Sequence, residues 1–123
     1  MDDWATPEGY YATLDREFHF DDDPCKFGGL YRDINGLERE WGSRVFVNPP
    51  YSRPGPWVRK AIAESKRGKL VVMLLKADTS TSWFHDLVLP NAEIRWIKGR
   101  LRFSNQGRAP FPSMLAIFRE RHA

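Results

Sequence analysis

The chain has 123 residues, is 41% hydrophobic and 14% aromatic, and carries a net charge of +3, which favours one globular domain over a disordered chain. No stretch approaches the ~20 apolar residues that span a bilayer, the first residues are acidic, unlike those of a signal peptide, and a single cysteine excludes an internal disulfide. We therefore expect a single domain over residues 1–123, located in a reducing cytoplasm, with no membrane partner.

The charge is divided unevenly along the chain. Residues 1–43 contain 11 acidic and 4 basic residues, a net of −7, whereas residues 44–123 contain 5 acidic and 15 basic residues, a net of +10. An acidic half suits a cationic cofactor and a basic half suits a phosphate backbone. Ordinary surface charge that mixes on folding is the alternative interpretation.

The N-terminal segment Thr6-Pro7-Glu8 has the signals of a helix start, with Thr6 as N-cap and an acid in the first turn. Apolar residues at helical spacing then predict a helix from Pro7 to about Glu17. The alternating Phe18-His19-Phe20 predicts a short strand, which ends in Asp21-Asp22-Asp23.

The next strand is predicted at Arg44 to Val47, a β-branched and aromatic run. It must stop at Asn48, because Pro49 and Pro50 have fixed φ and no N–H to donate. A carboxamide, a stiff turn and the ring of Tyr51 therefore follow the carboxyl end of a strand. In open α/β sheets this is where ligands bind.

This segment suits chemistry on a conjugated amino group such as that of a nucleobase. The Asn48 side-chain oxygen and the Pro49 carbonyl can accept its N–H bonds and stabilise the positive charge that grows as the nitrogen attacks an electrophile. Tyr51 can stack on a base that has left its helix. A plain turn with a surface tyrosine is the alternative.

The rest of the chain alternates helices with strands. We expect a helix with the stripe Trp57, Val58, Ala61 and Ile62 ending at Gly68, a central parallel strand at 70–75, a helix at 83–89, a strand and turn or hairpin from 92–98 and 101–103, and a strand at 113–118. This order predicts an α/β three-layer α/β/α sandwich with a mixed sheet.

Lys98, Arg100 and Arg102 form a compact basic cluster around the predicted turn. With Arg108 and with Arg53 beside the Asn-Pro-Pro-Tyr segment, they are candidates for phosphate contacts. The alternative is that they only solubilise an exposed edge. The three histidines are scattered without cysteine partners, so we expect no metal site.

Asn48-Pro49-Pro50-Tyr51 is similar to the catalytic motif of amino-group methyltransferases that use S-adenosylmethionine, and the wider chain resembles the phage-type DNA adenine N6-methyltransferases. The resemblance is also carried, in order, by Trp4 to Pro7, Asp23-Pro24-Cys25, Trp57-Val58, Val72 to Leu75, Thr79 to His85, Gly99 to Phe103 and Pro112-Ser113. It implies a shortened Rossmann-like methyltransferase fold, encoded by a phage or prophage and acting in the cytoplasm of a bacterial or archaeal host.

The resemblance also implies a set of cofactor contacts. For S-adenosylmethionine these are Trp4, Thr6, Pro7, Asp23, Asp33 and Asn48, and the catalytic residues are Asn48, Pro49, Pro50 and Tyr51. The chain departs from most relatives between Lys26 and Glu40, which is shorter here and would hold the adenosine pocket. We expect a second subunit or a shallower site to compensate.

The leading hypothesis is methylation of the adenine N6 amino group in double-stranded DNA. RNA adenine, cytosine N4 and a glutamine amide also offer a conjugated amino group and remain alternatives. A third hypothesis is a nucleic-acid-binding or inactive module that has lost its cofactor.

Overall fold

The computed structural model describes residues 6–25, 36–103, 107–108 and 111–120, so the sequence candidates Trp4 and Asp33 lie outside the described residues. Along the described chain follow α1 (Glu8–Phe18), β1 (Arg44–Val47), α2 (Gly55–Ser65), β2 (Leu70–Lys76), the π-helix η2 (Phe84–Val88), β3 (Glu93–Trp96), β4 (Arg102–Phe103), β5 (Gly107–Arg108) and β6 (Ser113–Phe118). The predicted strands at 44–47, 70–75 and 113–118 are confirmed. None of the described helices has the length and apolar character needed to cross a membrane.

Four strands form a mixed, open sheet in the order β1-β2-β6-β3. β1 and β2 are parallel, with Val45 opposite Val71, and α2 supplies the crossover between them. β6 runs antiparallel to both of its neighbours. The chain also adds one parallel bridge beyond β1, between Asp22 and Val45. The predicted α/β class and mixed sheet are therefore confirmed.

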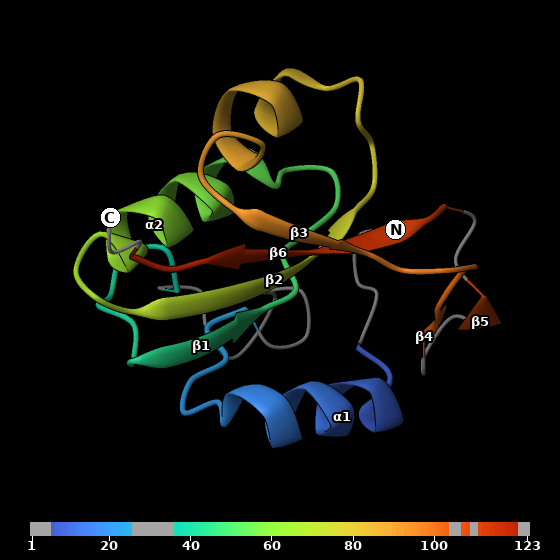
Figure 1. Ribbon diagram of the computed structural model, residues 1–123, viewed down its shortest axis with the longest axis horizontal. Coiled ribbons are helices and arrows are strands. Elements are labelled where there is room, and N and C mark those ends of the chain that lie inside the picture. Colours follow the sequence, from blue (N-terminus) through green and yellow to red (C-terminus); the bar gives the residue numbers. More distant parts are fainter. Residues whose placement is uncertain (1–5, 26–35, 104–106, 109–110, 121–123) are drawn as a thin grey trace.

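The sheet is buried on both faces because alternate residues of each strand pack against different helices. On one face α1 lies across the sheet, and on the other lie α2 and η2 (Figure 1). The two resulting clusters, the α1-side core and the α2-side core, take alternate residues of β2: Leu70, Val72 and Leu74 in the first, and Val71, Met73 and Leu75 in the second.

A buried carboxylate of α2 binds the chain segment that precedes β1. Glu64 of α2 is 2% exposed and accepts hydrogen bonds from the Trp41 backbone N–H (3.1 Å) and the Lys69 ammonium (2.9 Å). The Trp41 indole donates in turn to the Gly36 carbonyl at 2.7 Å. Burial by itself raises the pKa of Glu64, but the bonds from Lys69 and Trp41 outweigh it and hold this pKa below its usual value.

The N-terminal predictions need correction. Pro7, not Thr6, occupies the N-cap position of α1, and no side chain caps this helix end. Phe18 belongs to the helix because it is buried on the same face as Leu14, four residues earlier. His19 then takes the left-handed conformation (φ 54°), which ends the helix. The predicted strand at 18–20 is thus wrong, and sheet pairing begins only at Asp21, whose N–H donates to Arg44.

Of the two alternatives for 92–98 and 101–103, the structure excludes the hairpin and has a strand at Glu93–Trp96 followed by a bend. β3 pairs with β6, with Trp96 opposite Met114, and β4 pairs with β5. Gly99 does adopt a positive φ of 72°, but the strands on either side of it find partners later in the chain. Apolar alternation predicted that both segments are extended and could not predict which strands they join.

Candidate active site

The carboxyl ends of β1, β2 and β3 lie at one edge of the sheet, because β3, like β2, is antiparallel to β6. We call this side the carboxyl edge. The start of β6, the β4–β5 pair and the chain segment that leads into α1 gather at the same edge (Figure 1). Ligands of open α/β sheets bind at such an edge.

Asn48 follows β1 at this edge and is 8% exposed. Its side-chain Nδ2 donates a hydrogen bond to the Thr6 hydroxyl oxygen at 2.9 Å, although the two residues are 42 positions apart in the chain. The contact brings together two residues that the sequence singled out, and it fixes the rotation of the carboxamide. Because Nδ2 is the donor to Thr6, Oδ1 is the atom able to accept a hydrogen bond from a substrate amino group.

Tyr51 lies within the turn that runs from Pro50 to Arg53. Pro49 is buried, and the turn is closed by a hydrogen bond from the Arg53 N–H to the Pro50 carbonyl at 3.1 Å. The Tyr51 ring packs against the α1-side core and meets Phe111 edge-to-face, with ring centroids 4.8 Å apart. Burial raises the pKa of the Tyr51 phenol, so this hydroxyl keeps its proton at physiological pH.

Two residues of this edge were missed by sequence reasoning as members of the site. Phe111 supports Tyr51, and the Lys76 ammonium lies over the face of Phe111, 5.6 Å from the ring centroid. Lys76 ends β2, so its place directly after a buried apolar run could have drawn attention to it. Phe111 comes from a loop, and the sequence carries no comparable signal for its contact with Tyr51.

Of the three adjacent acids at 21–23, the first two have different partners. Asp22 forms a bidentate ion pair with Arg39 (2.8 and 2.9 Å) and accepts the Gly42 N–H at 2.9 Å. Asp21 accepts the backbone N–H groups of Ser43 and Arg44. A Cβ on Gly42 would collide with the Asp21 carboxylate, so a larger residue there would have to displace this carboxylate from the N–H groups that it accepts.

Asp23 is half-buried and follows the bridge beside β1, as Asn48 follows β1 itself. After burial, its charge is the next cause that raises the pKa of Tyr11 in α1. A carboxylate therefore lies near the α1 side of the carboxyl edge, which fits the predicted preference for Asp23 over its two neighbours as a contact for a cationic ligand.

Three of the basic candidates lie toward the β3 end of the same edge. Lys98, Arg100 and Arg102 are exposed and follow β3, and Arg53 is exposed beside the Tyr51 turn. The backbone of Arg108 pairs with that of Arg102 in the β4–β5 pair. The cations after β3 thus lie away from Asp23, whereas Arg53 lies beside β1. Elsewhere the two halves of the sequence mix, because Glu17 pairs with Arg95 and Glu40 pairs with Arg67 and Lys69.

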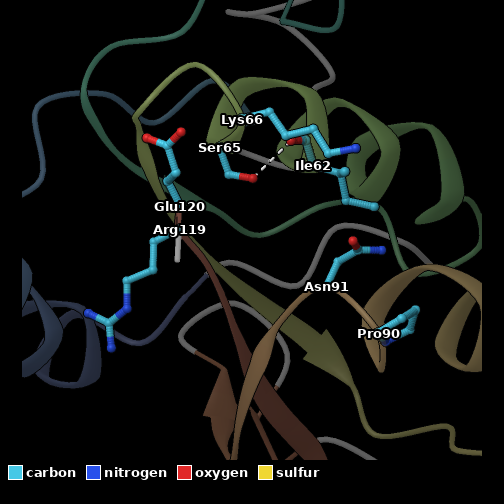
Figure 2. Close-up of a pocket in the computed structure, with 7 residues that line it drawn as sticks. All are labelled: Ile62, Ser65, Lys66, Pro90, Asn91, Arg119 and Glu120. Carbon is cyan, nitrogen blue, oxygen red and sulfur yellow. Dashed lines mark hydrogen bonds between the residues drawn. The ribbon is translucent and has the colours of Figure 1, made fainter. Parts of the chain in front are cut away.

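A pocket of about 240 Å³ lies at the opposite edge of the sheet, where α2 and β6 end (Figure 2). It is lined by Ile62, Ser65, Lys66, Pro90, Asn91, Arg119 and Glu120. None of the sequence candidates contributes to it. Among the residues that the structure describes, no three His, Cys, Asp or Glu side chains are close enough to hold a metal ion.

Comparison with known proteins identifies relatives over nearly the whole chain. The profile of a family described as DNA N-6-adenine-methyltransferase (Dam) matches residues 1–120. A protein of Escherichia phage T1 called DNA N-6-adenine-methyltransferase is 35% identical over 127 aligned positions, covering 89% of this chain and 53% of the phage protein. A protein of Haemophilus phage HP1 with the same name is 38% identical over 115 positions, covering 83% and 66%.

The chain spans between about half and two thirds of the length of these curated relatives. No solved structure matches it.

Proposed function

Because the chain belongs to the DNA N-6-adenine-methyltransferase (Dam) family, we propose that it transfers a methyl group from S-adenosylmethionine to the N6 amino group of adenine in double-stranded DNA. The observation that carries this proposal is the Asn48 carboxamide, which is held by Thr6 at the carboxyl end of β1 with Oδ1 as its acceptor atom. The half-buried Asp23 and the exposed cations Lys98, Arg100 and Arg102 support the two substrates, one cationic and one polyanionic.

The proposed mechanism depends on position and charge rather than on a strong base. Asn48 Oδ1 and the Pro49 carbonyl accept the two N6–H bonds of an extruded adenine, which orients the nitrogen lone pair and stabilises its growing positive charge. Tyr51 stacks on the base, and its contact with Phe111 holds the ring in place before DNA binds. The N6 proton leaves to solvent after the transfer.

The residues near β1 fit the cofactor. When bound, S-adenosylmethionine supplies a methyl group on a positively charged sulfur. Asp23 provides a half-buried carboxylate next to β1 at the carboxyl edge. Thr6 and Pro7 lead into α1 beside Asn48, so they would border the same ligand. Trp4 and Asp33 complete the proposed set from the resemblance alone.

The fold supports a shortened Rossmann-like sandwich. The parallel bridge, β1 and β2 lie side by side, β6 is inserted antiparallel, and helices cover both faces. We further propose that a phage gene encodes the protein, that it acts in the cytoplasm of the host, and that a second subunit completes the adenosine pocket. Sedimentation with and without cofactor tests the last point.

The decisive experiment measures transfer of tritiated methyl groups to unmethylated duplex DNA, RNA and protein, followed by mass spectrometry of the nucleosides. We expect N6-methyladenine from DNA, and we expect Asn48→Ala to lower the rate by about 10²–10³ while the protein stays folded. The matched control is Asn91→Ala, at the opposite edge. Label only in RNA, cytosine or glutamine, or no binding of S-adenosylmethionine in a calorimetric titration of the folded protein, would contradict the proposal.

A further inference from the structure

Trp96 leaves a large apolar ring in water. Its side chain is 62% exposed, compared with 52% for Leu89 and 37% for Leu37, the other large hydrophobic residues that are exposed in the described chain. It ends β3, the outermost strand on its side of the sheet, at the carboxyl edge. A tryptophan offers roughly 150–250 Å² for burial, and tryptophan is enriched among the residues that dominate binding energy at interfaces.

The Trp96 ring packs against a buried aromatic residue. Trp96 lies opposite Met114 and therefore faces the α2 side of the sheet, where it meets Phe84 of η2 with ring centroids 6.3 Å apart. Phe84 is itself buried in the α2-side core. A ring held in this way loses little further freedom when a ligand covers its outer surface, so this position is suited to binding.

Cations surround the chain segment that follows Trp96. Ile97 and Leu101 pack against the α1-side core and anchor the segment, while Lys98, Arg100 and Arg102 point to solvent. Ion pairs do neutralise other charged residues of β3, joining Arg95 to Glu17 and Glu93 to Arg119, both at 2.7 Å. Within the described part of the chain, no carboxylate lies within ion-pair distance of the three cations after Trp96.

We propose that Trp96 packs against the base and sugar of a DNA nucleotide flanking the target adenine, next to phosphate contacts made by Lys98, Arg100 and Arg102. This inference rests on the proposed function. β3 is three strand spacings from β1, about 14 Å at ~4.8 Å per spacing. That span equals about four nucleotide steps of ~3.4 Å. Trp96 therefore contacts a nucleotide in the sequence that flanks the target adenine, and not the base held by Asn48.

A binding titration over a range of salt concentrations separates the ring from the cations. With a fluorescent duplex and anisotropy as readout, Trp96→Ala should weaken binding about 10-fold or more at every salt concentration and leave the slope of log affinity against log salt unchanged. Arg100→Ala should instead flatten that slope by about 0.9. Trp96→Phe should keep most of the affinity, and Leu89→Ala, an exposed apolar residue away from the carboxyl edge, should bind as the wild type does.

Unchanged affinity in Trp96→Ala, or a slope that flattens as in Arg100→Ala, would overturn the inference. So would a change in sedimentation without a change in DNA affinity, which would assign the ring to contact with a second copy. If Trp96→Ala does not fold, 5-fluorotryptophan labelling of the wild type gives the answer, with the Trp96 signal assigned by its loss in Trp96→Phe. We expect that ¹⁹F signal to shift when duplex is added, and an unshifted signal overturns the inference.

The same preparations distinguish this inference from the proposed function. Loss of DNA affinity in Trp96→Ala, with no methyl transfer by the wild type, supports the contact and refutes the activity. Methyl transfer by the wild type, with full affinity in Trp96→Ala, supports the activity and refutes the contact.

Discussion

Replacing Thr6 with valine tests whether the catalytic carboxamide must be held in place. The substitution keeps the branched shape of the side chain and removes only the oxygen that accepts the 2.9 Å hydrogen bond from Asn48 Nδ2. A hydrogen bond contributes about 0.5–1.5 kcal/mol net, and leaving a buried donor without a partner costs about 1–3 kcal/mol. Because Asn48 is 8% exposed, we expect unfolding to become easier by about 1 kcal/mol.

The effect on turnover follows from the same bond. Each ~1.4 kcal/mol in the barrier changes the rate tenfold, so losing an orienting interaction of about 1 kcal/mol should lower kcat about 5-fold. Steady-state methyl transfer to duplex DNA measures this change, and Thr6→Ser, which restores the hydroxyl, should return most of the rate. In the background of Asn48→Ala, the Thr6→Val substitution should have almost no further effect, because the group it orients is gone.

Two results would refute this reasoning. A kcat equal to that of the wild type in Thr6→Val would show that Thr6 does not orient the carboxamide. A larger dissociation constant for S-adenosylmethionine in calorimetry, with kcat preserved at saturating cofactor, would show that the hydroxyl contacts the cofactor directly, as the resemblance implies.

Three further predictions concern the ring, the cations and the buried carboxylate. Tyr51→Phe should retain most of the activity, whereas Tyr51→Ala should lose roughly 1–3 kcal/mol of base stacking, and equal damage in kinetic assays would assign the role to the hydroxyl. The double change Arg100→Ala with Arg102→Ala should flatten the salt slope of DNA binding by up to about two, and an unchanged slope would mean that these residues only solubilise the edge. Since Lys69 holds the pKa of Glu64 below its usual 4.5, the stability from this pair is present above about pH 4.5 and is lost as pH falls through the lowered pKa. In urea titrations, Glu64→Gln should cost about 3 kcal/mol at pH 7 and less at pH 3, and an equal cost at both would be inconsistent with this linkage.

The sequence predicted those elements whose signal is local. β1, β2 and β6 are apolar runs bounded by polar or proline residues, and their bounds agree with the prediction to within one residue. The error at 18–20 and the failure of the hairpin alternative at 92–103 have different causes. His19 terminates α1 through its left-handed backbone, and β3 joins a strand some twenty residues later, so neither outcome follows from alternation along a few residues.

The same distinction applies to the site. Asn48 at a strand end was predicted because a proline pair stops the strand there, whereas its bond to Thr6 joins residues far apart in the chain. The predicted N-cap at Thr6 was wrong, because its hydroxyl accepts a hydrogen bond from Asn48, directly after β1, and caps no helix end. Phe111 enters the site only through packing at the carboxyl edge, which no local signal encodes, whereas Lys76 is marked by its place at the end of a buried apolar run.

The position of β6 has a consequence for how the protein folds. This strand is fully buried and lies between β2 and β3, so both core clusters depend on residues 113–118. β6 follows the other strands of the sheet in the sequence, and until it pairs, β2 lacks a partner on one edge and β3 has no sheet partner. Non-local pairing of this kind slows folding and leaves edges open to aggregation. The native sheet is therefore completed only when β6 pairs with both β2 and β3.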